Sequence, residues 1–177
     1  MGFIQGYDKD TLQEIVDRSA VYDRLVEITG QRSFPSQLEQ VWLYKVLGEL
    51  DDALRIAEHA VRLARMSGTR KDLLHARIMH ASVNHLRGAF SRAETELTTC
   101  IEEADGQKWP RIAALAHSHR GKVRYDAGDY EGARSDFKRE LFLRQEMGAD
   151  DETLEQTMTF IEAAESKRGS TATGLFA

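Results

Sequence analysis

The sequence predicts an all-α fold built from repeated helical hairpins, and three observations lead to this prediction. Gly48, Gly88 and Gly128 recur every 40 residues, and each begins a Gly-x-x-x-x-Ala phrase. A constant period of this size is typical of a solenoid of repeated supersecondary units. Apolar and small residues at offsets of 2, 5, 9 and 13 after each glycine share one helical face. No segment alternates apolar and polar residues, so no strands are expected.

Each repeat is predicted to be a helix, a tight turn and a second helix. Another helical set of apolar and small residues precedes each glycine and ends at it. Glycine adopts the left-handed conformation that stops a helix, so each repeat glycine is expected to end a first helix. Ala53, Ala93 and Ala133, five residues after the glycines, are small and would let the two helices of a hairpin approach closely.

Local signals indicate where the helices begin. Ser36 with Glu39 and Ser91 with Glu94 have the spacing of a capping box, and Pro110 fits a first helical turn. The expected helices, in chain order, cover about residues 9–29, 35–47, 51–66, 71–87, 91–105, 110–127, 131–147 and 151–167.

The ends of the chain are expected to differ from its middle. Terminal repeats of a solenoid need caps with one polar face, and Leu154, Met158 and Ile161 form an apolar stripe on an otherwise charged last helix. The expected organisation is an N-terminal helical cap at 1–33, three repeats within 34–147 (34–70, 71–109 and 110–148), a C-terminal capping helix at 149–168 and a flexible tail at 169–177.

Composition limits the classes of protein that this chain can represent. It is 41% hydrophobic, enough for a packed core, and its net charge of -5 does not favour a general nucleic-acid binder. The single cysteine, Cys100, excludes an internal disulfide and fits a reducing compartment. No apolar stretch is long enough to span a membrane, and no signal peptide is recognised, so a cytoplasmic location is expected.

The segment from Gly121 to Ala133, with the sequence GKVRYDAGDYEGA, resembles a tetratricopeptide repeat. It has the small residue of the first helix, the Gly-Asp-Tyr turn and the alanine of the second helix. The other two glycine phrases are weaker copies, and the 40-residue length resembles the longer-repeat branch of the family. Ala57 and Glu140 depart from the residues usual at their positions. The resemblance implies a right-handed α-solenoid of about three hairpins with a capping helix at each end.

The resemblance also implies a site, because the first helices of successive hairpins line a concave groove in this family. Its aromatic and cationic side chains suit a peptide, since rings supply contact area and lysines pair with carboxylates. An open alternative is a groove that is only a solvated face, or one covered by the chain's own first helix. The expected binding residues are Leu38, Trp42, Lys45, Ile78, Met79, Ser82, His85, His119, Lys122 and Tyr125.

The function expected from this resemblance is a protein–protein interaction module, acting as an adaptor, a scaffold or a peptide sensor. One alternative is a self-assembling structural protein that forms homo-oligomers through its flanking helices or through Leu175 and Phe176. Another, less favoured, is an RNA-binding helical repeat that uses a basic strip of Arg87, Arg120, Lys122 and Arg124.

Catalytic and metal-binding patterns are not recognised in the sequence. His75, His80 and His85 are spaced by five, and His117 and His119 by two, whereas helical zinc sites favour a spacing of four. Cys100 falls on the apolar stripe of its helix and is expected in the core. We therefore expect no enzyme, no cofactor and no metal, and a pH response of His85 and His119 stays open.

Overall fold

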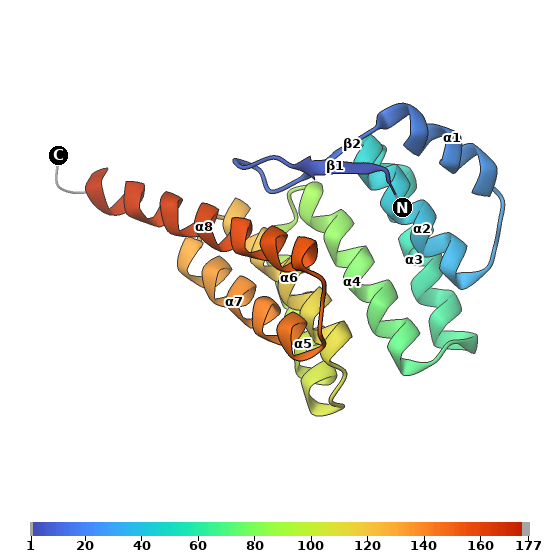
Figure 1. Cartoon of the computed structure of the whole chain (residues 1–177). Coiled ribbons are helices and arrows are strands. Elements are labelled where there is room, and N and C mark those ends of the chain that lie inside the picture. Colours follow the sequence, from blue (N-terminus) through green and yellow to red (C-terminus); the bar gives the residue numbers. More distant parts are fainter. Residues whose placement is uncertain (1, 175–177) are drawn as a thin grey trace. The chain divides into compact units, whose positions relative to one another are not determined.

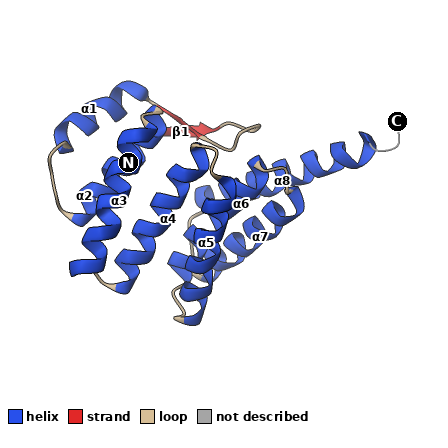
Figure 2. Ribbon diagram, turned by 180° about the vertical axis from the view of Figure 1, so that it is seen from behind, coloured by secondary structure: helices blue, strands red, loops and turns tan. Residues whose placement is uncertain are grey.

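The computed structural model describes the backbone of residues 2–174, and most of these residues are helical. Two short strands and eight helices occur in this described part of the chain (Figures 1 and 2). The all-α class predicted from the sequence is confirmed. The chain separates into two compact units, one of Met1–Asp8 with Gln13–Glu96 and the other of Lys9–Leu12 with Leu97–Ala177.

The first unit begins with two antiparallel strands, β1 (Ile4–Tyr7) and β2 (Glu14–Val16). They correct the prediction of a strand-free chain with a helix over about 9–29. Strands of four and three residues are too short to show a clear alternation, and Gly6 interrupts the first of them. The sequence pattern therefore contained no usable strand signal.

Four complete helices and the start of a fifth make up the rest of the first unit. One of them, α3 (Leu50–Ser67), has a buried face made of alanines. Ala53, Ala57, Ala60 and Ala64 on this face are each at most 3% exposed. This face packs between the neighbouring helices, and small side chains there allow a close approach. The helices are α1 (Arg18–Ile28), α2 (Phe34–Leu47), α3 (Leu50–Ser67), α4 (Arg70–Leu86) and α5 (Phe90–Gly106).

The predicted turn glycines are confirmed. Gly48, Gly88 and Gly128 have φ angles of 84°, 81° and 84°, in the left-handed region. After each glycine, the next residue donates its N–H to a carbonyl in the last turn of the helix, as Glu49 does to Tyr44 at 2.9 Å. This bond satisfies a carbonyl that the ending helix leaves unpaired.

The second unit contains the rest of α5 together with α6 (Pro110–Asp126), α7 (Tyr130–Glu146) and α8 (Asp151–Gly174). Gly121 of α6 lies directly against the ring of Phe137 on α7. A Cβ atom at Gly121 would lie 2.5 Å from Cε1 of Phe137, so any other residue here would have to displace the ring. The Phe137 ring in turn lies 5.4 Å from that of Phe160, between centroids, and both rings are fully buried.

The predicted capping boxes are wrong. Ser33, rather than Ser36, caps α2, because its side chain accepts a hydrogen bond from the Ser36 N–H. Ser91 lies inside α5, which already begins at the preceding residue. A capping box does occur at α4, where Thr69 and Asp72 each accept a bond from the other's backbone N–H. Serine and acid spacing alone did not distinguish these sites.

The C-terminal helix is longer than predicted. Part of the expected flexible tail at 169–177 is helical, because α8 continues as far as Gly174. An established helix adds further residues at little cost, so serine, threonine and glycine can be accommodated at its end. Residues 175–177 lie outside the described part of the chain.

Candidate functional site

In the first unit, two of the three predicted binding residues on α2, Trp42 and Lys45, contact the N-terminal segment, and the third, Leu38, packs in the core against α3 and α4. Leu38 and Lys45 are buried, and Trp42 is half-buried. The ring of Phe3 lies 6.3 Å from that of Trp42, between centroids, and Glu14 Oε1 is 3.8 Å from Lys45 Nζ. Trp42 also packs against a buried cluster that includes Val21, Leu25 and Ile28 of α1. Both the strand segment and the first helix therefore lie against this face of α2.

The predicted binding residues on α4 are also buried. Ile78, Met79, Ser82 and His85 are at most 7% exposed. The Ser82 hydroxyl donates a 2.8 Å hydrogen bond to the Met79 carbonyl, and the His85 ring lies 5.8 Å from that of Phe90. These four residues pack the interior of the first unit, and their contact with a ligand stays a prediction.

In the second unit, the three predicted residues on α6 differ in exposure. His119 and Lys122 are half-buried, and Lys122 Nζ lies 4.9 Å from the centroid of the Phe160 ring, in a cation–π contact. Tyr125 is only 4% exposed and packs edge-on against Tyr130 with 5.4 Å between ring centroids.

Tyr125 lines a pocket of about 430 Å³ that lies within the second unit. Its hydroxyl oxygen is buried and has no hydrogen-bond partner among the described residues. Burial raises the pKa of Tyr125, although Lys167 opposes this shift, so the hydroxyl stays protonated near neutral pH. A buried hydroxyl without a partner is unfavourable, so an acceptor atom supplied by a ligand would stabilise it. The lining residues are Lys9, Asp10, Tyr125, Thr159, Glu162, Ala163, Ser166 and Lys167.

Charges of both signs surround this pocket. Lys167 Nζ donates a 3.1 Å hydrogen bond to Asp10 Oδ1, and this bond raises the pKa of Lys167. Lys9 and Glu162 add one more charge of each sign. A balanced polar lining suits a ligand that carries donors and acceptors together, as a peptide does, better than a strongly charged one.

A buried carboxylate that sequence reasoning missed joins α6 to α7. Asp136 is 2% exposed and accepts hydrogen bonds from His117 Nδ1 at 2.8 Å, from Arg120 at 2.7 and 2.9 Å, and from Arg124 at 3.0 Å. Burial alone would raise the pKa of Asp136, but the bonds from His117 and Arg120 outweigh it and lower the pKa.

This cluster bears on the RNA-binding alternative. Arg120 and Arg124 are engaged with the buried carboxylate in the second unit, and Lys122 lies over an aromatic ring there. In the first unit, Arg87 is paired with Asp51. All four members of the expected basic strip thus have partners within their own units, which weakens the case for RNA.

A second buried carboxylate lies four residues further along α7. Glu140 is fully buried, and its Oε1 lies 2.6 Å from an η nitrogen of Arg144. Burial raises the pKa of Glu140, and the charge of Arg144 opposes this shift. Glu140 is one of the two positions at which the sequence departs from the tetratricopeptide pattern. Arg144, one helical turn away, forms an ion pair with this carboxylate.

The sequence also contains cysteine and histidine side chains that could react or bind a metal. Cys100 is fully buried, as predicted. His80 Nδ1 lies 2.8 Å from Glu96 Oε2. Within the described residues, no group of three His, Cys, Asp or Glu side chains is arranged to hold a metal ion. Across the same range, no helix has the length and apolar character needed to cross a membrane.

Comparisons with known proteins bear on the fold. No family model and no curated protein matches the chain. Among solved structures, it is similar to the crystal structure of BtubC (BKLC) from P. vanneervenii, with a TM-score of 0.64 and 20% sequence identity. The similarity covers 85% of this chain and 65% of that chain. At this level of identity it shows the fold alone, an all-α helical repeat.

Proposed function

We propose that this protein is a non-enzymatic protein-interaction module of the tetratricopeptide-repeat type, which binds a peptide or a partner helix as an adaptor, a scaffold or a peptide sensor. The helical-repeat fold and the residues of the glycine phrases support this proposal. The observation that carries it is the buried, unpartnered hydroxyl of Tyr125 at a pocket of ligand size.

The chemistry of this pocket matches that of a peptide. Every peptide unit offers a carbonyl, which can accept the proton of the Tyr125 hydroxyl. The ammonium group of Lys167 and the carboxylate of Asp10 can exchange part of their mutual pairing for the polar groups of a bound chain. Tyr125 and the lining residues of α8 stand on packed helices, so this part of the pocket requires little ordering when a ligand binds.

Replacement of Tyr125 by phenylalanine tests the proposal. Peptides are first selected from a displayed random library with the wild-type protein, and their affinities are then measured by fluorescence polarisation. Loss of one hydrogen bond should weaken binding roughly 3- to 10-fold. The same change should leave stability unchanged or raise it, because it removes an unpaired buried hydroxyl.

Tyr130→Phe is the matched control, since the Tyr130 ring packs against the Tyr125 ring but does not line the pocket. It should leave the affinity of the selected peptides unchanged. If the selected peptides bind Tyr125→Phe as tightly as wild type, or if no peptide is selected above background, the proposal of a peptide site at this pocket is wrong.

Self-assembly remains the second candidate, and one observation favours it. Tyr22 and Val26 are 60% and 61% exposed on α1, and their spacing of four places them on one face. Leu175 and Phe176, the other expected contacts, lie outside the described residues. A mass that rises with concentration in light scattering, and that Tyr22→Lys reduces to the monomer value, would favour this candidate.

A further inference from the structure

The first unit contains another pocket, of about 580 Å³, whose lining is positively charged. Arg32, Arg55, Arg62 and His59 line it, and no Asp or Glu is among its described lining residues. The whole chain carries a net charge of -5, so this is a local excess of positive charge. A concave surface with charges of one sign focuses the field toward ligands of the opposite sign.

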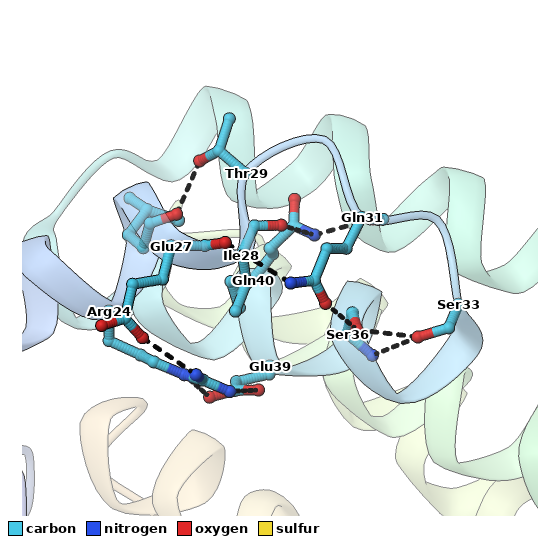
Figure 3. Close-up of polar contacts among 10 residues, drawn as sticks. Arg24, Glu27, Ile28, Thr29, Gln31, Ser33, Ser36, Glu39 and Gln40 are labelled. Atoms are coloured by element: carbon cyan, nitrogen blue, oxygen red, sulfur yellow. Dashed lines mark hydrogen bonds and ion pairs between the residues drawn. The ribbon is translucent and has the colours of Figure 1, made fainter.

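The α1–α2 corner, which forms one wall of this pocket, is held by side-chain hydrogen bonds (Figure 3). Gln40 is 4% exposed, and its Nε2 donates to the carbonyls of Ile28 at 3.1 Å and Gln31 at 3.0 Å. The Gln31 side chain accepts a 2.9 Å bond from the Ser36 hydroxyl. This wall is therefore fixed before any ligand arrives.

A second buried glutamine orients the histidine of the pocket. Gln37 is 3% exposed, and its Nε2 donates a 2.9 Å bond to the Arg32 carbonyl. Its Oε1 therefore faces His59 Nδ1, 2.7 Å away, and that nitrogen must be the donor. Of the two ring nitrogens of His59, Nε2 is therefore the one that Gln37 does not engage.

The two arginines of α3 that line the pocket have only weak local partners. Arg55 Nη2 lies 2.8 Å from Asp52 Oδ1, and Arg62 Nη1 lies 4.0 Å from Glu58 Oε2. Each acidic partner is within about one helical turn of its arginine. All four of these side chains are at least 48% exposed, and exposed pairs of this kind contribute little stability. Both guanidinium groups can therefore turn to a ligand, whose oxygens match their forked geometry.

We propose that this pocket binds a small phosphate monoester. Three guanidinium groups, from Arg32, Arg55 and Arg62, favour a dianionic head over a single carboxylate. Tyr44 and Ile56 also line the pocket and offer an aromatic and an aliphatic surface to the organic part of the ligand. A volume of about 580 Å³ lies in the range of small-molecule sites. The assignment uses residues of the first unit alone and does not depend on peptide binding.

The test is a calorimetric titration of the full chain with phenyl phosphate, with benzoate and phenol as comparison ligands. Phenyl phosphate should bind saturably, and its affinity should fall as sodium chloride is added. Arg62→Gln, and separately Arg55→Gln, should weaken binding by about 10-fold, because each removes one charge-assisted contact. Arg65→Gln is the matched control, since Arg65 is also exposed on α3 but does not line the pocket.

Three outcomes would overturn the proposal. The first is no saturable binding of phenyl phosphate to wild-type protein whose helix content by circular dichroism is normal. The second is an equal loss of affinity in Arg62→Gln and Arg65→Gln, which would indicate general charge attraction. The third is benzoate binding as tightly as phenyl phosphate, which would indicate a carboxylate site instead.

Discussion

Replacement of Asp136 by asparagine should strongly destabilise the second unit. The carboxylate is 2% exposed and receives hydrogen bonds of 2.7–3.0 Å from His117, Arg120 and Arg124. Asparagine has nearly the same volume, but it loses the charge and places an N–H donor against arginine donors. Removal of one partner from a buried ion pair costs about 3–5 kcal/mol. This is a large fraction of the roughly 5–15 kcal/mol that stabilises a typical domain.

The two tryptophans allow the second unit to be followed alone, because Trp109 belongs to it and Trp42 to the first unit. In a Trp42→Phe background, Trp109 fluorescence is measured against urea concentration. With a slope of about 2 kcal/mol/M, a loss of about 4 kcal/mol lowers the midpoint by roughly 2 M. Asp105→Asn is the control, because Asp105 is 44% exposed and its pair with Arg139 is 3.9 Å long. That pair should contribute less than about 1 kcal/mol.

Equal midpoints for Asp136→Asn and Asp105→Asn would refute this reasoning. The pH dependence provides a second check. The pKa of Asp136 is lowered in the folded state, so its contribution is complete above the unfolded value of about 3.9. The contribution is lost as pH falls through the folded pKa, so wild type and Asp136→Asn should converge in stability at strongly acidic pH.

Two further predictions concern the same pair of helices. Burial raises the pKa of Glu140, so wild-type stability should fall as pH rises above the unfolded value of about 4.3. Glu140→Gln should therefore gain stability relative to wild type between pH 4 and pH 7 in urea titrations, and a pH-independent difference would contradict this. Gly121→Ala should destabilise the second unit by about 1–3 kcal/mol, because the new methyl group meets the buried Phe137 ring. Gly106→Ala, whose Cβ would meet nothing within 4 Å, should match or exceed the wild-type urea midpoint, and equal midpoints for the two alanine variants would contradict the packing argument.

The helices and their turns could be predicted because the evidence for them is local and repeated. Gly48, Gly88 and Gly128 show the same backbone conformation at the same offset from the same helical faces. Each of α2 to α8 begins within about one residue of its predicted position. Departures occur where a signal is short or not repeated, as at the N-terminal strands and at the end of α8.

The candidate site could be predicted only in part. Tyr125 follows from its offset within the repeat, but its pocket also needs residues 9–10 and 159–167, which no repeat offset reaches. Asp136 lies 16 residues from Arg120 in sequence, and nothing in either helix alone indicates that they pair. Burial of charged groups depends on which helical faces meet, and that is settled only when the whole unit is packed.

The complete burial of Cys100 has a practical consequence for the dynamics of the protein. Because it is the only thiol in the chain, a thiol reagent added to the native protein modifies a single, known position. Modification requires an opening that exposes the side chain, so the labelling rate at low reagent concentration reports the free energy of that opening. A value equal to the global unfolding free energy would indicate that this part of α5 opens only when the second unit unfolds, whereas a smaller value would reveal a local breathing motion.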